Sequence, residues 1–494
     1  MSKYVFFTGG VVSGLGKGIT AMSLGKLMKA RGYRVDVVKF NPYFNIDAGN
    51  LCAKSYGETF VTSDGHSCDL VIGHYERILD ENITARGDIT SGEIYNLVIE
   101  KERQNFYDGQ TVQVVPHITD EIKRCILRVG ENADIVLVEL GGTVGDIETQ
   151  PYMEAIRQLK ANLGKTNVAY IHVSLVPYID VSGEQKTKPT QHSVKELQNL
   201  GIQPDVIVCR SDYPLDASTR GKLSLFCNVD RDCVIESMVT PNIYEIPLML
   251  EEEGFCGVVL RKLRMEDRAP DLGALTSFCE SIKRLEGESS CLRIGLIGKN
   301  ADKADVNMSL RHALLISGVE VCKRVEVVPF NMDGGFDGGE LAALHGIIIT
   351  AETGAAGRVV LKALITTAEQ NDIPTLLLSD AAYLGLFAGE KSTFLTDKHK
   401  YGQYAVDFVK GSLLHKLYGE SAGQRFKSKM YVPKEIFDRL PIRLSGICED
   451  GSVAAYEKDG HRFFVGVFFR PEFLARPNSP SPVISAFLKS CINE

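Results

Sequence analysis

Short apolar runs alternate with longer amphipathic stretches along the first half of the chain, a pattern typical of a parallel α/β sheet. An apolar run at Tyr4–Thr8 ends in glycines and precedes a helix predicted over Gly18–Arg31 and a strand over Arg34–Lys39. Further strands are predicted at Asp134–Glu139, Asn167–Ser174 and Asp205–Cys209, with helices at His117–Val129, Gln150–Leu163 and Ser193–Leu200. We therefore expect residues 1–265 to form a doubly wound parallel sheet that binds ligands at the carboxyl ends of its strands.

A second alternation of strands and helices begins at Leu292–Gly298 and continues through Gly346–Thr350 and Pro374–Leu378. Residues 266–291 between the two halves are charged and rich in turn formers, and we interpret them as a linker. The pattern thus predicts a second α/β domain over residues 292–494, so that the whole chain belongs to the α/β class.

Composition narrows the class of protein. The 494 residues are 44% hydrophobic and 24% charged, which is ordinary for a globular protein, and the net charge of −8 disfavours nucleic-acid binding. The 12 cysteines include no CxxC pair and are expected to be reduced core thiols of a cytoplasmic protein, Cys322, Cys448 and Cys491 among them. The chain starts directly in a predicted strand and contains no apolar run near the ~20 residues that span a bilayer, so we expect neither a secretory leader nor a membrane segment.

The glycine-rich loop Gly9–Gly18 follows a predicted strand and opens a predicted helix. Glycines let backbone N–H groups converge on phosphate oxygens, and a helix N-terminus adds positive potential. Lys17 is then placed to contact a transferring phosphate. The spacing departs from the strict P-loop pattern, since Gly10 stands one residue too far from Gly16 and Gly18 replaces the usual Ser or Thr. The alternative is a glycine-rich turn without a ligand.

With that loop, the chain resembles the CTP synthase family, two-domain amidoligases that make CTP from UTP, ATP and glutamine. The resemblance continues in five blocks: KFNPYFN (39–45), GHYER (73–77), QVVPHIT (113–119), ELGGTVGDIE (139–148) and SGEQKTKPTQHS (182–193). The second half is similar in layout and in the segment Arg470–Phe473. The resemblance implies a P-loop-type first domain and a flavodoxin-like, class I glutaminase-like second domain.

It also implies a reaction in which ATP phosphorylates the uracil 4-oxygen and an amine then displaces phosphate. Lys17 and Lys39 would be catalytic, stabilising charge on the phosphoryl group, and Glu139 would hold Mg²⁺. The resemblance implies that the ATP phosphates are held by Ser13, Gly14, Leu15, Gly16, Lys17, Gly18 and Ile19. It implies that the pyrimidine nucleotide is held by Ser13, Asp146, Ile147, Glu148, Lys186, Thr187, Lys188, Pro189, Thr190, Gln191 and Lys222. The alternative for the three lysines of that set is a solvated surface. A homotetramer with the nucleotide bridging chains is expected.

The predicted synthetic site differs from the family pattern at three places: the metal ligands, the adenine pocket and the entrance for the nucleophile. The family usually has Asp-x-Asp before the GHYER block, and here the second Asp is Val71, so we expect Asp69 to substitute as the metal ligand if both positions lie on one strand. The family Asp of the KFNPYFN block is Asn41, and the adenine-proximal Asp is Val239. The ammonia entrance is changed at Leu51–Ala53 and Tyr56.

The second half departs from the family at every position that hydrolyses glutamine except one. Ser379 stands where the nucleophilic Cys is expected, without the flanking glycines, and Arg470 replaces the His base while Glu472 remains. The oxyanion segment is changed across Thr350–Arg358. Because Arg stays protonated, it is a poor base, and we expect no glutaminase activity.

Two functions of different classes follow from these observations. The first is a ligase that activates UTP or a related uracil nucleotide with ATP and Mg²⁺ and installs nitrogen from free ammonia or another amine. A specialised-pathway ligase that uses a different nucleophile is a variant of it. The second is a catalytically silent paralogue that binds nucleotides and regulates or assembles with an active enzyme. Val71, Asn41 and Val239 favour this alternative, and Lys17, Lys39 and Glu139 oppose it.

Overall fold

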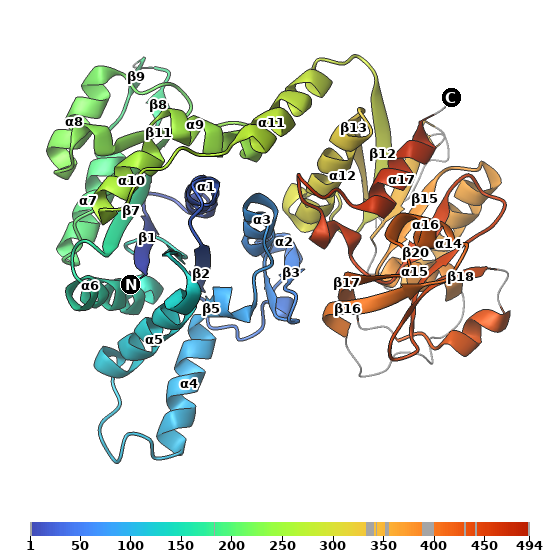
Figure 1. The fold of residues 1–494 in the computed structure, drawn as a ribbon, viewed down its shortest axis with the longest axis horizontal. Helices are drawn as coiled ribbons and strands as arrows, with labels where there is room; N and C mark the ends of the chain where they lie inside the picture. Colours follow the sequence, from blue (N-terminus) through green and yellow to red (C-terminus); the bar gives the residue numbers. More distant parts are fainter. Residues whose placement is uncertain are drawn as a thin grey trace. The chain divides into compact units, whose positions relative to one another are not determined.

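A computed structural model of the chain divides into two compact units, Met1–Ile46 with Ala85–Cys279 and Asp47–Thr84 with Glu280–Glu494 (Figure 1). The structure describes residues 2–181, 183–331, 340–341, 343–350, 355–387, 400–428, 431–439 and 442–492. The two units are described separately below. Their boundaries differ from the predicted domains at one point, because Asp47–Thr84, hereafter the inserted segment, groups with the second half of the chain.

The first unit is built on a 7-stranded sheet in the order β11-β10-β7-β1-β6-β2-β5, and every neighbouring pair in it is parallel. Its strands are β1 (Lys3–Gly9), β2 (Val35–Asn41), β5 (Asp88–Thr90), β6 (Ile135–Leu140), β7 (Val168–Leu175), β10 (Val206–Ser211) and β11 (Val234–Met238), and β8 (Tyr178–Ile179) pairs with β9 (Glu184–Gln185) in a small hairpin. The predicted doubly wound parallel sheet is confirmed.

Helices cover both faces of this sheet because the strands alternate apolar side chains between the faces. Phe6 packs with the buried side chains of α5 and α6, such as Ile122 and Ile156, while its neighbours Val5 and Phe7 are equally buried on the opposite side. The helices of the unit are α1 (Lys17–Ala30), α4 (Ser91–Arg103), α5 (Thr119–Val129), α6 (Gln150–Leu163), α7 (Lys188–Asn199), α8 (Ala217–Cys227), α9 (Ile246–Glu252) and α10 (Phe255–Leu263). Helix α7 begins five positions before the predicted Ser193, because Pro189 occupies its first turn, where a missing N–H costs nothing.

The second unit contains a mixed 9-stranded sheet in the order β13-β12-β14-β15-β20-β19-β18-β16-β17. The pairs from β13 to β20 are parallel and the remaining pairs are antiparallel. Its strands are β12 (Cys291–Gly298), β13 (Arg324–Asn331), β14 (Gly346–Ile349), β15 (Thr375–Leu378), β16 (Lys400–Phe408), β17 (Ser421–Ser428), β18 (Arg443–Cys448), β19 (Val453–Glu457) and β20 (Phe464–Val467). The predicted second α/β architecture is confirmed.

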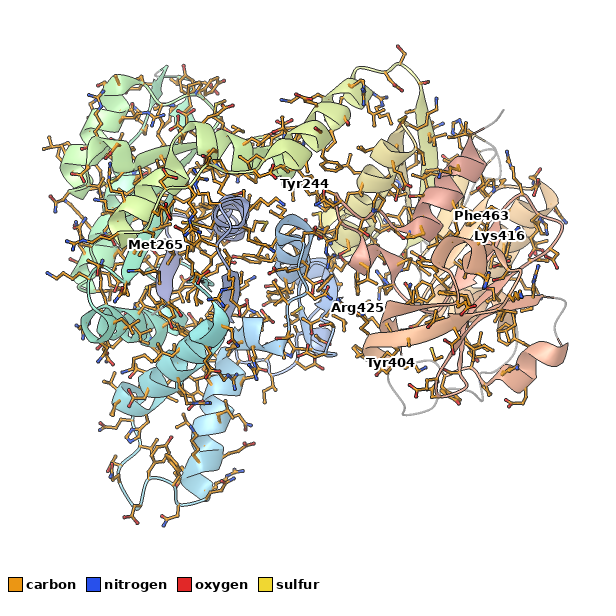
Figure 2. All side chains as sticks on the ribbon, viewed as in Figure 1. Tyr244, Met265, Tyr404, Lys416, Arg425 and Phe463 are labelled. Atoms are coloured by element: carbon orange, nitrogen blue, oxygen red, sulfur yellow. The ribbon has the colours of Figure 1, made fainter. Side chains whose placement is uncertain are left out.

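Two helices of this unit, α2 (Ala53–Tyr56) and α3 (Leu70–Leu79), belong to the inserted segment. Further helices are α12 (Met308–Glu320), α14 (Ala355–Gln370), α15 (Asp380–Phe387), α16 (Leu413–Tyr418) and α17 (Pro482–Cys491), and the inserted segment adds the hairpin β3 (Thr59–Val61) and β4 (Ser67–Asp69). Buried charged side chains connect the inserted segment to the rest of the second unit. Glu76 of α3 accepts a hydrogen bond from Arg476 at 2.7 Å. It also lies 3.5 Å from Arg425 of β17, which is labelled in Figure 2.

Two expectations from the sequence are wrong in detail. The region interpreted as a linker contains helix α11 (Gly273–Glu286), because Leu275, Phe278, Ile282 and Leu285 recur at helical spacing and are buried. Cys322, expected to be a core thiol, is exposed at a turn, whereas Cys448 and Cys491 are buried as expected. No helix in the described part of the chain is long and apolar enough to cross a membrane.

Candidate functional site

The glycine-rich loop of the first unit connects the carboxyl end of β1 to the start of α1. Gly16 caps α1 in the left-handed conformation, with a φ of 86°, and no side chain forms a capping hydrogen bond there. The N–H groups of the first helical turn have no intrahelical acceptor, so this terminus offers donors and positive potential to an anion.

Two glycines of the loop are so close to neighbouring side chains that a larger residue would not fit. A Cβ on Gly10 would lie 1.6 Å from the hydroxyl oxygen of Ser193 in α7, and a Cβ on Gly9 would lie 2.7 Å from the side chain of Lys17. Any larger residue would push α7 or Lys17 out of place. The glycines thus bring the loop against α7 and leave Lys17 lying along the end of β1.

Lys17 is buried and its ammonium donates a hydrogen bond to the carbonyl oxygen of Gly142 at 2.7 Å. Burial lowers the pKa of Lys17, the negative charges of Glu139 and Asp146 raise it, and the positive charge of Lys39 lowers it further. The four predicted groups therefore interact with one another. Lys17 is thus a buried cation whose charge is influenced by two nearby carboxylates and one nearby lysine.

Lys39 and Glu139 are opposite each other in the parallel register of β2 and β6, and both are buried. Asp146 follows β6 and accepts a hydrogen bond from the backbone N–H of Thr143 at 2.6 Å. The structure therefore brings Lys17, Lys39, Glu139 and Asp146 together at the carboxyl edge of the sheet, where ligands of open α/β folds bind.

The remaining predicted nucleotide residues lie on three segments of the same unit. A shallow pocket of about 330 Å³ is lined by residues of the glycine loop, of the turn after β6 and of α7, namely Gly10, Val11, Thr143, Val144, Gly145, Pro189, His192, Ser193 and Glu196. Thr190 and Gln191 of α7 are buried, whereas Ile147 is 85% exposed. Ile147 is therefore an apolar side chain exposed to solvent between the acidic residues Asp146 and Glu148.

The predicted lysines of the pyrimidine-nucleotide set gather around α7 and α8. Lys186 forms an ion pair with Glu184, and this contact, together with the charge of Lys222, lowers the pKa of that carboxyl. Lys188 lies 5.9 Å from the ring centre of Phe226 in α8. The cluster is largely exposed, as both a triphosphate site and a solvated surface require.

Sequence reasoning missed two polar residues in the core of this site. His172 of β7 accepts or donates hydrogen bonds with Thr8 at 2.9 Å and with Ser193 at 2.7 Å, and burial lowers its pKa to about 3. Arg210 of β10 lies against the loop, where a Cβ on Gly16 would be 2.8 Å from its guanidinium. Both interrupt apolar strands near their carboxyl ends, and that interruption is the signal that could have revealed them.

The expectation that Asp69 and Val71 face the same side of one strand is wrong. Strand β4 ends at Asp69 and α3 begins at Leu70, and the Asp69 carboxylate accepts a hydrogen bond from the N–H of Val71 at 2.9 Å. Asp69 is thus the N-cap of α3. It belongs to the second unit and Glu139 to the first, so their joint binding of Mg²⁺ stays a prediction.

Asn41 replaces a carboxylate without leaving a gap in the local hydrogen bonding. Its side-chain amide donates to Asp88 of β5 at 2.8 Å, and both side chains are buried. A carboxylate therefore lies beside Asn41, supplied by Asp88, a residue that the sequence did not single out. Val239, at the position expected to lie near the adenine, is 47% exposed.

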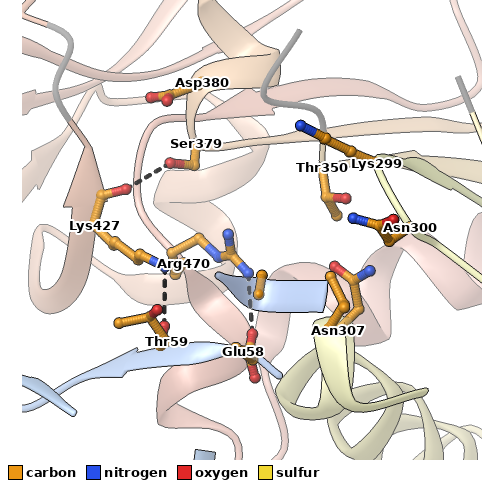
Figure 3. Close-up of a pocket in the computed structure, with 12 residues that line it drawn as sticks. Glu58, Thr59, Lys299, Asn300, Asn307, Thr350, Ser379, Asp380, Lys427 and Arg470 are labelled. Carbon is orange, nitrogen blue, oxygen red and sulfur yellow. Dashed lines mark hydrogen bonds and ion pairs between the residues drawn. The ribbon is translucent and has the colours of Figure 1, made fainter. Parts of the chain in front are cut away.

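In the second unit, a pocket of about 130 Å³ surrounds the predicted nucleophile position (Figure 3). Its walls come from the inserted segment, from the turns after β12 and β14, and from β17, and they comprise Ala53, Glu58, Thr59, Lys299, Asn300, Val306, Asn307, Thr350, Ser379, Asp380, Lys427 and Arg470. Beyond Thr350, the predicted oxyanion segment falls at 351–354, which lies outside the described residues, and on neighbouring residues whose side chains are also outside them.

Ser379, at the predicted nucleophile position, has a left-handed backbone and a hydrogen-bonded hydroxyl. It lies between β15 and α15 with a φ of 54°, a strained value for a residue other than glycine. Its hydroxyl donates a hydrogen bond to the carbonyl oxygen of Lys427 at 2.9 Å (Figure 3). The described residues place no histidine in this pocket.

Arg470 occupies the position of the base and is fixed by two carboxylates. It forms an ion pair with Glu472 and a second with Glu58 of the inserted segment at 3.2 Å. Glu472 is fully buried, and this burial raises its pKa although Arg470 opposes the rise. The guanidinium cannot accept a proton, so Arg470 itself does not act as a general base.

Known proteins are similar to the chain over its whole length. A family model described as CTP synthase N-terminus matches residues 3–265. The CTP synthase of Methanocaldococcus jannaschii is 40% identical over 537 residues, covering 100% of this chain and 99% of that protein. The CTP synthase of Symbiobacterium thermophilum is 41% identical with the same coverage. A solved Trypanosoma brucei CTPS glutaminase domain with bound acivicin is 20% identical with a TM-score of 0.36, covering 40% of this chain and 93% of that one. Because identity of about two residues in five extends across essentially the full length of such relatives, this chain belongs to the CTP synthase family.

Proposed function

We propose that the chain is a CTP-synthase-like ligase that uses ATP to phosphorylate the 4-oxygen of UTP, or of a related uracil nucleotide. Free ammonia or another amine then displaces the phosphate, and glutamine is not hydrolysed. The observation that carries the proposal is the cluster of Lys17, Lys39 and Glu139 beside the uncapped N-terminus of α1. Phosphoryl transfer is catalysed mainly by positioning and charge, and this cluster supplies both.

Each residue of the cluster has a distinct task in this proposal. The first-turn N–H groups of α1 hold phosphate oxygens, and Lys17 and Lys39 offset the negative charge that moves during transfer. Glu139 offers the carboxylate oxygen that Mg²⁺ prefers, and a magnesium ion bound there supplies charge neutralisation at the phosphates. The donor set therefore fits ATP with Mg²⁺.

The uracil nucleotide is assigned to the neighbouring pocket beside α7. Asp146 and Glu148 face the base side in this assignment, and Lys186 and Lys222 meet the triphosphate. The exposed Ile147 supports a homotetramer in which a second chain covers this surface and completes the site.

The source of nitrogen is external in this proposal. Ser379 donates its hydroxyl to a backbone carbonyl, and Arg470 is held between two carboxylates, so neither a nucleophile nor a base is available for glutamine. An enzyme that keeps its synthetic site then depends on ammonia or another amine that reaches the activated uracil directly.

The test is incubation of the purified chain with UTP, ATP and Mg²⁺ and one of three nitrogen sources: ammonium, a panel of amines, or glutamine. We expect a product with the mass of CTP or of an N-substituted CTP in the first two reactions and none with glutamine alone. Steady glutamate release from glutamine that Ser379→Ala abolishes would overturn the loss of glutaminase activity.

A silent paralogue is the second candidate, and Asp69 favours it. The carboxylate expected to compensate for Val71 already caps a helix, so the second metal ligand that the family pattern calls for is committed to the backbone. A protein of this kind binds nucleotides without turnover and acts by assembling with an active enzyme.

Lys17→Ala separates the two candidates. Removing a contact that stabilises transition-state charge costs about 2.7–4 kcal/mol, so we expect turnover with ammonium or the active amine to fall ~10²–10³-fold. Lys416→Ala, which changes an exposed lysine of α16 in the second unit, serves as the matched control and should leave turnover unchanged. If both variants and the wild type bind triphosphate equally and none turns over, the silent paralogue is the better account.

A further inference from the structure

Helix α7 packs against β7 through two kinds of buried side chain (Figure 1). In the second half of the helix they are apolar, namely Val194 and Leu197. In the first half they are polar, and Thr190, Gln191 and Ser193 are all buried. The first half is also the part of α7 that carries predicted contacts to the uracil nucleotide. The polar contacts thus lie where the position of the helix matters most for a bound ligand.

The polar side chains of α7 contact a pair of polar side chains on β7. His172 and Ser174 are two positions apart in the strand, so they face the same side of the sheet, and both are fully buried. Nε2 of His172 lies 2.7 Å from the hydroxyl oxygen of Ser193. The Ser174 hydroxyl donates to that of Thr190 at 3.1 Å, and Thr190 donates to the carbonyl oxygen of Leu175 at 2.9 Å. Two sets of hydrogen bonds therefore join the helix to the strand.

His172 also contacts the segment that leads into the glycine-rich loop. Its Nδ1 lies 2.9 Å from the hydroxyl oxygen of Thr8, the residue opposite His172 in the parallel register of β1 and β7. A Cβ on Gly10 would lie 3.5 Å from the ring carbon Cε1, so the loop runs close to the ring. Burial and the charge of Lys17 lower the pKa of His172, which leaves the ring neutral at pH 7, with one nitrogen as donor and the other as acceptor. The imidazole thus links Thr8 and Ser193, and we call this link the His172 bridge.

A buried polar bridge restricts geometry more than apolar packing does. Hydrogen bonds tolerate only a few tenths of an ångström in length, and a buried polar group that loses its partner is costly. If α7 moved along the strand, His172 and Ser193 would be left unpaired in the interior, whereas apolar side chains could repack. The bridge therefore opposes displacement of α7 relative to the loop.

We propose that His172 is a positioning residue that holds α7 in a fixed place relative to the glycine-rich loop. The uracil nucleotide on α7 is thereby aligned with the ATP phosphates on the loop. This inference rests on the proposed function, which assigns the two nucleotides to these two segments. His172 is fully buried and acts through Ser193 and Thr8. Transfer needs the reacting atoms ~3–3.5 Å apart, so a small shift of one nucleotide slows the reaction without removing its own contacts.

Hydrogen–deuterium exchange of the full chain tests the bridge without turnover. Adenylyl imidodiphosphate, a non-hydrolysable ATP analogue, is added with Mg²⁺ and without UTP, and mass spectrometry follows peptides from the loop (residues 9–20) and from α7. We expect the analogue to slow exchange in both segments of the wild type, because ordering the loop also orders a helix that is bridged to it. His172→Leu removes both hydrogen bonds, so the loop should keep its protection and α7 should lose it.

Two further variants assign the effect to the bridge. Ser193→Ala removes the contact with α7 alone and should also abolish the protection of α7, which decides the question if His172→Leu does not fold. Tyr170→Phe is the matched control, because Tyr170 lies on the same face of β7 and its hydroxyl donates to the carbonyl oxygen of Ile156 in α6 at 2.9 Å. It loses one buried hydrogen bond but should keep the protection of α7. Loss of that protection in Tyr170→Phe as well would show that any weakening of the core separates the two segments, and would overturn the proposal.

Turnover with ammonium or the active amine gives a second measurement. His172→Leu should lower kcat by about 10²-fold and leave the KM for ATP nearly unchanged, since a misplacement of about 1 Å has this effect on rate. Adding Ser193→Ala to His172→Leu should cause no further loss, because the two residues form one bridge.

The outcomes separate this inference from the proposed function. If the analogue protects α7 in the wild type and not in His172→Leu, but nothing is turned over, the ligase reaction fails and the bridge stands. If the wild type is active and α7 is either unprotected or equally protected in His172→Leu, the bridge fails and the ligase stands. If the analogue protects neither segment of the wild type, the ATP assignment fails and this inference fails with it.

Discussion

A single carboxylate can be needed by the backbone and by a ligand at the same time, and Asp69 illustrates the conflict. Its oxygen caps α3 through the N–H of Val71. Asn caps helices as well as Asp does, while Ala does not, so the two duties can be separated by substitution.

We expect Asp69→Asn to leave the free energy of unfolding nearly unchanged and to lower the turnover rate at limiting Mg²⁺, because it keeps the cap and removes the charge. Asp69→Ala should lose both, with a stability cost of about 0.5–2 kcal/mol. Urea unfolding and a magnesium titration of activity measure the two effects. Full activity of Asp69→Asn at every magnesium concentration would remove Asp69 from the metal site, and Val71→Asp should then be neutral or activating by restoring the family's ligand.

Because His172 is buried, it should make the free energy of unfolding depend on pH. Its pKa is lowered to about 3, against ~6.5 in an unfolded chain, so below pH 6.5 the unfolded state binds a proton that the folded state does not. Stability should fall with decreasing pH between 6.5 and 3, by about 1.4 kcal/mol per pH unit from this residue.

Urea midpoints at pH 5 to 7.5 measure the effect. We expect His172→Gln to be less stable overall, since two hydrogen bonds are disturbed, but to show a shallower loss on acidification than the wild type. His415→Gln, in the half-buried last turns of α16, is the control and should keep the wild-type slope. Identical slopes for His172→Gln and wild type would mean that other groups cause the acid sensitivity.

At the scale of elements, the inserted segment depends on pairing of buried charges across long stretches of sequence. Glu76 meets Arg476 and Arg425, and Arg425 also donates to the carbonyl oxygen of Val61 at 2.6 Å. Burial lowers the pKa of Arg425, and the charge of Glu76 opposes this. Removing the carboxylate would leave two guanidinium groups in the interior without their anion.

Glu76→Ala should therefore lower the free energy of unfolding by about 3–5 kcal/mol, and Glu76→Gln by a comparable amount although it preserves volume. Glu449→Ala, at an exposed turn of the same unit, should stay within ~0.5 kcal/mol of wild type. Urea unfolding followed by circular dichroism gives the values. A loss below ~1 kcal/mol in Glu76→Ala would show that the charges are solvated in solution.

The same contacts explain which elements the sequence could predict. Strands such as β1, β6 and β7 were predicted within a residue or two, because each is a continuous apolar run between glycines, helices and turns. The placement of the inserted segment could not be predicted, since Glu76 and Arg425 are 349 positions apart and neither lies in a local motif. The candidate site residues show the same difference. Lys17 could be predicted because glycines flank it in the sequence. Lys299 and Lys427 are far apart in the sequence and line one pocket only in the folded chain.

At the scale of the whole molecule, exposed apolar side chains occur on the segments that carry the predicted nucleotide contacts. Val11, Val12, Ile147 and Val181 are exposed by between 42% and 100%. A larger patch of exposed apolar side chains can mark a surface that contacts another protein chain.

We expect the chain to form homotetramers, and UTP with ATP to increase their share, because the nucleotide would contact more than one chain. Light scattering coupled to gel filtration, with and without nucleotide, measures the mass. Ile147→Asp should shift the distribution toward smaller species, and Leu225→Asp, on the exposed face of α8, tests whether any exposed apolar position has this effect. A wild-type protein that stays monomeric with nucleotide contradicts the expectation.

The left-handed backbone at Ser379 has a consequence for how such proteins are found and reused. Ser379 has a positive φ although it is not glycine and lacks flanking glycines, so the dihedral angle marks this turn at a place where a search for the local residue motif would not. One geometric feature of a nucleophile turn, a left-handed residue between a strand and a helix, is therefore present at this position. An engineer who wanted a new acyl-transfer centre here would start from the side chains alone, with Arg470 as the first to replace.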